Sequence, residues 1–465
     1  MKEQTQSSLL KKQLFEQRKN GWNRITQQEQ EAVAEFAKGY TEFLAQAKTE
    51  REAVVYAVTM LEQAGFTPFD PNGSYQAGDR VYTVNRNKAL IAAVIGEQPI
   101  ENGIRIVASH IDSPRLDLKQ HPLYEAEELA YLKTHYYGGI RKYQWVTVPL
   151  ALHGVVVLAN GSTVTVTIGE DDGDPQFVIT DLLPHLGAEQ NKRTLADGIR
   201  GEELNVLIGS RPFNDDGEAE AVKLQVMNLL FEKYGMIEAD FVSAELELVP
   251  AVKPVDIGLD RSMIGAYAHD DRVCAYPSLV ATAQLTVPSH TVVTVLADKE
   301  ETGSDGNTGL RSSYLEYFIH DLAATFGANG RRVLSASKCL SADVNAAFDP
   351  TFADPFEKRN ASFINYGAVL TKYTGGRGKY DTSDASAEFT AWIRNQMDQA
   401  GVVWQTGELG KVDAGGGGTV AKYIANLNVD VIDLGVPVLC MHAPFEIISK
   451  LDLYMTYRAI QTFFC

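Results

Sequence analysis

The stretch TVVTVLADKEE, residues 291–301, joins an apolar run rich in β-branched residues directly to two adjacent glutamates. A short run of this kind is typical of a buried strand. In an open α/β sheet, ligands bind in the crevice beyond the carboxyl ends of the strands. The stretch therefore predicts an α/β fold in which Glu300 and Glu301 lie at the functional edge of the sheet.

Three further apolar runs each stop at a side chain that can bind a metal ion. IRIVASH ends at His110, RRVLSASKCLSAD ends at Asp343, and VDVIDLGVPVLCMH ends at His442. Strand ends that are far apart in sequence can meet at the same edge of a sheet. Together with the two glutamates, these residues indicate a metal-dependent hydrolase.

The size and charge of the chain limit its class. With 465 residues it exceeds what one core usually supports, so one large domain and a second domain are expected. Its formal net charge is −18 and its sequence pI is about 5.0. Because phosphate backbones are bound by clustered Lys and Arg, this charge argues against a nucleic-acid partner.

The cysteines and the apolar segments bear on location. The four cysteines have no C-x-x-C spacing, which favours free, mostly buried thiols in a reducing compartment: Cys274, Cys339, Cys440 and Cys465. The first 25 residues contain no apolar stretch long enough for a signal peptide, and no other segment reaches the length of a membrane span. We therefore expect a cytoplasmic protein without a membrane partner.

The spacing of apolar residues predicts helices and strands of an α/β fold at both ends of the chain. Helical spacing runs through residues 26–65, and strand-like runs follow up to about residue 120. After about residue 251 the pattern of helices and strands expected of an α/β fold resumes. Further helical patterns occur at residues 272–285, 309–326, 385–401 and 421–427.

The middle of the chain has a different character. Residues 121–251 contain alternating β-type runs, and the pair Asn160-Gly161 between two such runs predicts a hairpin. We interpret this block as an inserted β-rich domain. It divides a catalytic domain into two segments, residues 1–120 and residues 252–465.

The residues at the strand ends offer the chemistry of a metallohydrolase. A metal-bound histidine usually donates its second ring N–H to a carboxylate or carbonyl, and Asp112 could accept it from His110. Of two adjacent glutamates, one can bind a metal while the other takes a proton from the attacking water. Two plainer interpretations stay open: a hydrogen-bonded histidine after a strand, and a solvated pair of acidic residues.

The segment His269-Asp270-Asp271-Arg272 opens a predicted helix. Its acidic residues fit an N-cap and favourable charge near the helix start. They also fit a metal centre in which one aspartate bridges two ions while the neighbouring aspartate and Arg272 hold it in place. Two histidines and three carboxylates without a thiolate suit Zn²⁺, with Co²⁺ or Mn²⁺ as replacements.

Five motifs, in this order and spacing, resemble the aspartyl aminopeptidase family of zinc metallopeptidases. They are ASHIDSPRLDLK, AYAHDDRVCAY, ADKEETGSDG, SADVN and CMHAPFE, which begin at residues 108, 266, 297, 341 and 440. The resemblance covers nearly the whole chain, including the β-rich block. It implies a zinc-peptidase α/β/α sandwich interrupted by a dimerisation domain, and homo-oligomers in the form of tetrahedral dodecamers that enclose the active sites.

The resemblance also implies two overlapping sets of metal ligands. One zinc ion would be held by His110, Asp270 and Asp343, and the other by Asp270, Glu301 and His442. Glu300 corresponds to the general base of the family. Asp112 and Asp271 are then the neighbours expected to support the ligands.

Further residues follow from the resemblance outside the metal cluster. His185 corresponds to a histidine that reaches a neighbouring subunit's active site and stabilises the oxyanion, although it also fits a simple turn. Lys372 corresponds to a lysine associated with the acidic side chain of the substrate. Gly416 and Gly417 lie in a Gly-rich segment that allows close backbone approach to the substrate or forms a flexible loop. The Lys-Ser/Thr of a phosphate-binding P-loop is absent there.

One departure from the family concerns specificity. Many members carry a histidine-containing segment after the position of Asp343, whereas this chain reads DVNAAFDPTF with Ala346 and Ala347 there. A preference for N-terminal Asp or Glu is therefore implied less directly than aminopeptidase activity. A broader or neutral specificity stays open.

These features predict a dinuclear-zinc aminopeptidase that acts on short peptides. A metal-activated bridging water would attack the first peptide carbonyl while Glu300 accepts its proton. A metal-dependent deacylase or carboxypeptidase with similar ligands is one alternative. A non-catalytic assembly protein with structural metals is another, but a structural site would not require Glu300.

Overall fold

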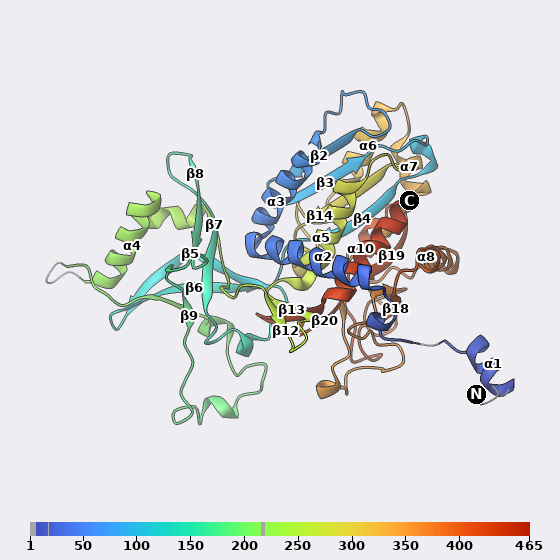
Figure 1. The fold of residues 1–465 in the computed structure, drawn as a ribbon. Coiled ribbons are helices and arrows are strands. Elements are labelled where there is room, and N and C mark those ends of the chain that lie inside the picture. Colours follow the sequence, from blue (N-terminus) through green and yellow to red (C-terminus); the bar gives the residue numbers. More distant parts are fainter. Residues whose placement is uncertain (1–5, 17, 215–218) are drawn as a thin grey trace.

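A nine-stranded mixed sheet forms the centre of the larger part of the molecule (Figure 1). The computed structural model describes residues 6–16, 18–214 and 219–465. In spatial order the strands are β1 (Thr67–Pro68), β2 (Arg80–Asn85), β3 (Ala89–Val94), β14 (Val292–Ala297), β4 (Arg105–His110), β15 (Lys338–Ser341), β19 (Asp430–Gly435), β17 (Ala368–Thr371) and β18 (Trp404–Thr406). The central strands β14, β4, β15 and β19 are parallel, so their carboxyl ends share one side of the sheet.

Helices cover both faces of this sheet, which is therefore the middle of three layers (Figure 1). One apolar cluster joins one face to α2 (Gln27–Gln46), α3 (Glu50–Gln63), α5 (His269–Gln284), α8 (Ala387–Gln399) and α10 (Lys450–Phe464). The other face packs on α6 (Tyr314–Thr325), α7 (Gly330–Ala336) and α9 (Ala421–Ala425). Val107 belongs to the first cluster and its neighbours Ile106 and Ala108 to the second, as the alternation of a strand requires. Helix α1 (Gln6–Leu14) stands apart from these layers in Figure 1.

The helices predicted from apolar spacing are present. Capping boxes start the first two of them, because Thr26 and Glu29 satisfy the free N–H groups of α2, and Thr49 and Glu52 those of α3. The four later helical patterns form α5, α6, α8 and α9, which confirms those predictions.

A seven-stranded antiparallel sheet forms the smaller part of the molecule. Its spatial order is β8 (Thr163–Ile168), β7 (Leu150–Val157), β11 (Ala244–Pro250), β5 (Arg115–Ala126), β6 (Leu129–Tyr137), β10 (Val206–Gly209) and β9 (Val178–Ile179). Strands β7 and β8 pair across Asn160-Gly161, which confirms the predicted hairpin. Helix α4 (Ala221–Tyr234) packs on this sheet. The division of the chain at residues 121 and 251 stays a prediction.

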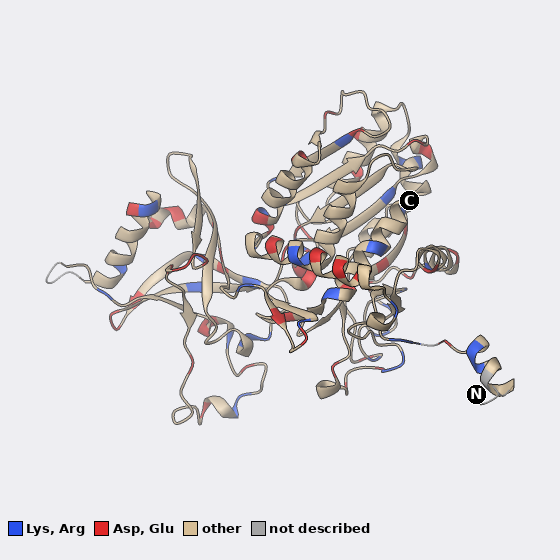
Figure 2. Ribbon diagram, viewed as in Figure 1, with Lys and Arg blue, Asp and Glu red and all other residues tan. Residues whose placement is uncertain are grey.

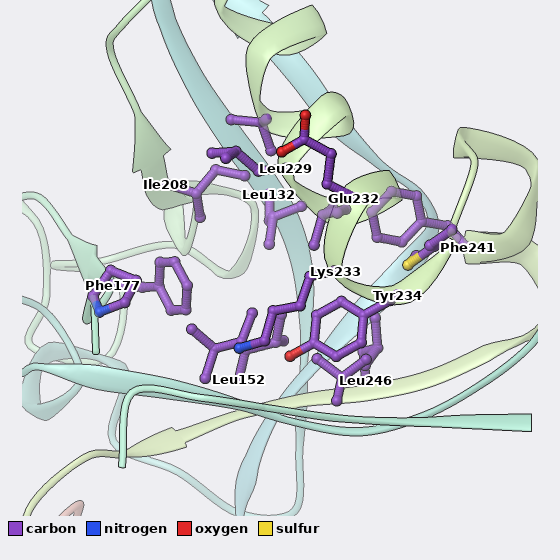
Figure 3. A pocket seen from close by; sticks show the side chains of 16 residues that line it. Leu132, Leu152, Phe177, Ile208, Leu229, Glu232, Lys233, Tyr234, Phe241 and Leu246 are labelled. Carbon is purple, nitrogen blue, oxygen red and sulfur yellow. The ribbon is translucent and has the colours of Figure 1, made fainter. Parts of the chain in front are cut away.

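An apolar cavity of about 540 Å³ lies between α4 and the seven-stranded sheet. Figure 3 shows leucine side chains from the strands, such as Leu132 and Leu246, facing Leu229 of the helix. Its lining includes two charged residues, Glu232 and Lys233, beside many apolar ones. None of the lining residues belongs to the groups of His, Asp and Glu side chains that, among the described residues, could hold a metal ion. The cavity is therefore a feature of packing in this part and not the predicted catalytic site.

A small five-stranded sheet and short 3₁₀ helices complete the fold. The sheet has the order β12 (Val255–Ile257), β13 (Met263–Ala266), β21 (Glu446–Ser449), β20 (Pro437–Leu439) and β16 (Asn345–Ala346). In Figure 1 it lies beside the junction of the two larger parts. The 3₁₀ helices are η1 (Gly21–Asn23), η2 (Ile100–Asn102), η3 (Lys142–Gln144), η4 (Gln190–Lys192), η5 (Gly201–Glu203), η6 (Glu238–Ser243), η7 (Glu300–Thr302) and η8 (Pro350–Phe352).

Buried charged side chains join the two parts. Acidic and basic positions are interspersed over both of them in Figure 2, but a subset is buried where α3 meets the seven-stranded sheet. Arg115 of β5 lies 3.3 Å from Glu50 of α3 and 3.2 Å from Glu247 of β11. The Lys48 ammonium donates to the carbonyl oxygens of Pro250 and Val252, both at 2.9 Å. Because each charge has a partner, this polar contact can be buried without leaving an isolated charge.

His153 connects the same two parts through both of its ring nitrogens. Nδ1 lies 2.8 Å from Glu52 Oε1 of α3, and Nε2 lies 3.0 Å from Glu170 Oε1. Burial alone would lower the pKa of His153, but the hydrogen bonds to Glu170 and Glu52 outweigh it and raise that pKa to about 8. The folded protein therefore favours the protonated ring.

This contact predicts a pH-dependent contribution to stability. Because the folded-state pKa of His153 exceeds the unfolded value of about 6.5, its stabilisation is complete below about pH 6.5 and is lost as pH rises through about 8. We expect His153→Gln to lower the free energy of unfolding by about 2 kcal/mol at pH 6 and by less at pH 9. Urea unfolding at both pH values checks this, with His121→Gln, an exposed histidine, as control. An equal loss at both pH values would rule out the charged contact.

Two sequence expectations need correction. Residues 429–442 form two strands in different sheets, because β19 ends at Gly435 and β20 belongs to the five-stranded sheet. His442 therefore follows β20 and not a strand of the nine-stranded sheet. The cysteines are free, but only Cys274 and Cys339 are buried, whereas Cys440 and Cys465 are exposed. Within the described residues, no helix combines the length and the apolar character needed to cross a membrane.

Candidate metal centre

Five widely separated elements bring the predicted metal ligands together. His110 ends β4, Asp270 lies in the first turn of α5, and Glu301 lies in η7 directly after β14. Asp343 follows β15, and His442 follows β20. Strands β4, β15 and β14, the strand that precedes η7, are parallel neighbours in the nine-stranded sheet, which explains why their ends meet.

Asp270 lies between the two histidines. Its Oδ1 lies 3.2 Å from His110 Nε2, and its Oδ2 lies 3.2 Å from His442 Nε2. His110 Nε2 is also 3.8 Å from Asp343 Oδ1, and His442 Nε2 is 3.6 Å from Glu301 Oε2. Each oxygen of Asp270 thus faces a different group of possible ligands.

The donor atoms form three overlapping groups, each with its members within 4.8 Å of one another. Two of them are the sets expected from the sequence: His110, Asp270 and Asp343, and Asp270, Glu301 and His442. The third contains His110, Glu300 and Glu301. Glu300 Oε2 lies 3.9 Å from His110 Nε2, and the Glu300 side chain is 18% exposed, against 3% for Glu301. Glu300 is therefore better placed to face the cleft than to sit among the ligands.

The carboxyl groups of the cluster repel one another in a buried setting. Burial raises the pKa of Glu300 to about 7, and it raises the pKa values of Glu301 and Asp343 well above their ordinary range, with neighbouring carboxylates adding to the effect. Burial would also raise the pKa of Asp270, but hydrogen bonds from the histidines hold it well below its usual value. Bound cations would supply positive charge here and displace protons from the ligands.

The donor set fits zinc. A tetrahedral zinc site with metal–ligand distances of about 2.0–2.2 Å places ligand atoms about 3.3–3.6 Å apart, close to the 3.2–3.8 Å found between these nitrogens and oxygens. Glu301 Oε1 is buried without a hydrogen-bond partner, which a bound cation would supply. Imidazole and carboxylate ligands without thiolate suit Zn²⁺.

Asp112 and Asp271 lie directly behind the ligands, as expected from the sequence. Asp112 is fully buried, accepts the backbone N–H groups of Glu300 and Glu301 at 3.1 and 3.2 Å, and lies 3.3 Å from His110 Nδ1. Asp271 Oδ2 accepts the backbone N–H of His110 at 3.2 Å. These bonds fix the backbone at both strand ends.

Glu446 supports the centre from β21 and was not among the residues predicted from the sequence. Its Oε1 accepts the backbone N–H of His442 at 2.6 Å, and its Oε2 accepts that of Asp270 at 3.0 Å. Its place in CMHAPFE, four residues after His442, was the available signal. Tyr137 and Gly139, which contact the centre from the seven-stranded part, gave no such signal.

A cleft of about 510 Å³ opens in front of the cluster. Its walls include Glu300, Gly416 and Gly417, so the Gly-rich segment lies beside the candidate centre. A Cβ at Gly416 would lie 2.2 Å from a backbone oxygen, which explains why glycine is needed there. Lys422 also lines the cleft, with its ammonium 3.0 Å from Asp381 Oδ1.

Two predicted residues lie outside this lining. Lys372 is half exposed at the end of β17, and its ammonium is 3.5 Å from Asp384 Oδ1. His185 is exposed in the long connection between β9 and β10, which extends away from the seven-stranded sheet in Figure 1. Within a single chain, neither residue belongs to a group of described side chains that could hold a metal ion.

Comparison with known proteins places these features among zinc peptidases. Residues 43–464 match the family model described as Aminopeptidase I zinc metalloprotease (M18). The chain is 46% identical to a probable M18 family aminopeptidase 1 of Clostridium acetobutylicum, over 97% of this chain and 98% of that protein. The crystal structure of an M18 family aminopeptidase from Thermotoga maritima has a TM-score of 0.91 at 43% identity, covering 97% and 99% of the two chains. A Saccharomyces cerevisiae mApe1 dodecamer structure shares the fold at 19% identity, with a TM-score of 0.74 and coverage of 92% and 96%.

Proposed function

Because this chain belongs to the aminopeptidase I (M18) family of zinc metalloproteases and is a metalloaminopeptidase, we propose that it uses two zinc ions to remove N-terminal residues from short peptides. The proposed ligands are His110, Asp270, Glu301, Asp343 and His442. The observation that carries the proposal is the position of Asp270, whose two oxygens each lie 3.2 Å from a different histidine. A carboxylate in that position can bridge a pair of ions. Co²⁺ or Mn²⁺ are proposed as replacements.

Glu300 is proposed as the residue that moves protons. When bound, zinc lowers the pKa of water and polarises a carbonyl oxygen. Glu300 lines the cleft beside His110, so its carboxylate can accept a proton from the attacking water and then deliver it to the leaving amine. Asp112 holds the Glu300 backbone through the N–H group at 3.1 Å and thereby orients this side chain.

Exopeptidase selectivity is proposed to arise from the acidic lining of the cleft. Glu300, Glu301, Asp270 and Asp343 all contribute to its walls. The free α-amine of the substrate would bind near one zinc ion or near Glu300, the lining carboxylate that is not among the proposed ligands, whereas an N-acylated peptide has no free amine to place there. This difference separates an aminopeptidase from a deacylase that uses the same ligands.

A substrate panel tests the proposed function. Aminoacyl anilides and their N-acetylated counterparts are assayed on the protein as purified, after chelation, and after zinc or cobalt is returned. We expect free-amine anilides to be hydrolysed, activity to disappear on chelation, and either ion to restore it. Cleavage of only the acetylated series would assign a deacylase, and activity that survives complete chelation would exclude a metal mechanism.

A preference for acidic N-terminal residues is also proposed. A lysine near the cleft would bind the carboxylate of the substrate's first side chain. Lys372 is the lysine that the family resemblance indicates, whereas Lys422 is the one that lines the cleft. Both already face a carboxylate, Asp384 at 3.5 Å and Asp381 at 3.0 Å. A substrate carboxylate would compete with these partners for the ammonium groups.

Paired alanine variants separate the two lysines. We expect Lys422→Ala to lower kcat/KM for Glu and Asp anilides about tenfold more than for Leu anilide, which corresponds to about 1.4 kcal/mol of discrimination. Lys372→Ala should have the same sign and a smaller size, since Lys372 lies outside the lining. Steady-state kinetics on the three anilides measure this. Equal losses for acidic and neutral substrates in both variants would remove the lysines from specificity.

The assembly is proposed to be a homo-oligomer, with a tetrahedral dodecamer as the expected form and the segment 121–251 as its dimerisation domain. The fold shared with the mApe1 dodecamer supports this proposal. In such an assembly the exposed His185 could reach a neighbouring subunit's cleft and stabilise the oxyanion, and folded proteins would be kept out. A cytoplasmic location is proposed from the four free thiols.

A further inference from the structure

We propose that the seven-stranded part completes the metal centre, with Tyr137 and Gly139 as positioning residues for Asp112 and His442. The proposal rests on the function proposed above, because it takes the same ligands as given. It adds that the loop after β6 is the outer support of the ligands, so that zinc binding and the contact between the two parts depend on each other.

Gly139 orients His442 across the junction. His442 Nδ1 lies 2.7 Å from the carbonyl oxygen of Gly139. A carbonyl oxygen can only accept, so Nδ1 must carry the proton of this bond. In the neutral ring, the lone pair of Nε2 then points toward Asp270 and Glu301, at 3.2 and 3.6 Å. Such a partner fixes the tautomer and the ring orientation of a metal-binding histidine.

Tyr137 acts on the other side of the centre through Asp112. Its hydroxyl donates to Asp112 Oδ2 at 2.8 Å. The same carboxylate accepts the N–H groups of Glu300 and Glu301 and lies 3.3 Å from His110 Nδ1. One tyrosine hydroxyl therefore holds the carboxylate that orients both glutamates, while the backbone carbonyl oxygen of the same Asp112 lies 3.0 Å from His110 Nδ1.

The glycines after Tyr137 allow the loop to lie against the ligands. A Cβ at Gly138, where φ is +75°, would lie 3.1 Å from Glu301 Oε2. A Cβ at Gly139 would lie 3.4 Å from His442 Nδ1. Gly139 also forms part of the cleft wall. The loop thus contacts His442 through its backbone and leaves no room for a side chain between Gly138 and Glu301.

Tyr137 is held in place by the charged contact between the two parts. The Arg115 guanidinium lies 3.9 Å from the centre of the Tyr137 ring, and the Lys299 ammonium lies 5.4 Å from it. Arg115 in turn pairs with Glu50 of α3 and Glu247 of β11. The contacts run without a gap from the junction to the metal ligands, so movement of the seven-stranded part would displace the supports of the centre.

Removal of one hydroxyl tests the proposal. Loss of a partner that orients a metal ligand usually costs 10–100-fold in metal affinity or activity. We expect Tyr137→Phe to weaken zinc binding to the apo-protein at least tenfold, measured by competition with a chelating dye. At saturating zinc, kcat should fall about tenfold with little change in KM, because Glu300 is less well oriented. Tyr136→Phe, a change of the exposed neighbour on the same strand, should match the wild type in both measurements.

Hydrogen exchange on the wild-type protein provides a second test that needs no variant. Zinc should slow exchange in the peptide covering residues 129–144, which includes β6 and η3. Wild-type zinc affinity and kcat in folded Tyr137→Phe would overturn the proposal, as would exchange in this peptide that zinc leaves unchanged. Either result could occur in a fully active zinc aminopeptidase, whereas failure of the proposed function would appear as a wild-type protein without zinc-dependent turnover.

Discussion

Glu300→Gln is expected to lower kcat by about 10²–10⁴-fold while the protein keeps its zinc, because the amide cannot accept the proton of the attacking water. Glu300 is the glutamate of the pair whose side chain is more exposed to the cleft, and its Oε2 lies 3.9 Å from His110 Nε2. The substitution preserves the shape of the side chain and the backbone bond to Asp112, so the ligands should stay in place. Steady-state kinetics and zinc analysis of the same preparation measure the two effects.

Glu301→Gln is the matched control for this experiment. Glu301 is almost fully buried, and its Oε2 lies 3.6 Å from His442 Nε2. Its loss should reduce zinc content as well as turnover. If Glu300→Gln lost zinc and Glu301→Gln kept it, the roles of the two glutamates would be exchanged. Near-normal kcat in Glu300→Gln would place the proton acceptor elsewhere.

Asp270→Ala should have the second large effect, the loss of both zinc ions together with nearly all activity. Asp270 is the member shared by the two expected ligand groups, and its oxygens face His110 and His442 at equal distances of 3.2 Å. Without it, each group loses a carboxylate at once. We expect zinc analysis after dialysis to give a content near zero per subunit.

Asp343→Ala is expected to lower the zinc content less than Asp270→Ala does. Asp343 belongs to the group of His110 and not to that of His442, so its removal should affect one ion more than the other. The expected order of zinc content is wild type, then Asp343→Ala, then Asp270→Ala. Full zinc occupancy in Asp270→Ala would reject the bridging position. Circular dichroism of each variant separates loss of zinc from loss of the fold.

The fold could be predicted from the sequence where local rules decide it. The apolar spacing of residues 26–65 predicted the helical region that α2 and α3 occupy, and capping boxes at Thr26 and Thr49 begin these two helices in the structure. The Asn160-Gly161 turn gave the hairpin of β7 and β8. The prediction that one strand runs up to His442 was wrong, because apolar spacing alone does not reveal that a chain leaves one sheet and enters another. Gly435 marks that exit, where a Cβ would lie 1.8 Å from the backbone oxygen of Asp343.

The metal-type residues could be proposed from the sequence because each stands at the end of an apolar run or the start of a helix. The residues behind them could not. Gly139 is 303 positions from His442, and Tyr137 reaches Asp112 because the pairing of β5 with β6 sets Tyr137 opposite Arg115, three residues after Asp112. The first contact depends on how the two parts dock and the second on strand register, and the spacing of apolar residues encodes neither. The sequence also gives no means of choosing between Lys372 and Lys422 as a residue of the cleft. The fold shows that Lys422 lines the cleft and that Lys372 does not.

The most direct test of the paired centre is a crystal of the zinc-loaded protein measured at the zinc absorption edge. We predict two anomalous peaks about 3.5–4 Å apart, one beside each oxygen of Asp270, with His110 and Asp343 next to one peak and His442 and Glu301 next to the other. A single peak, or zinc bound away from Asp270, would contradict the account.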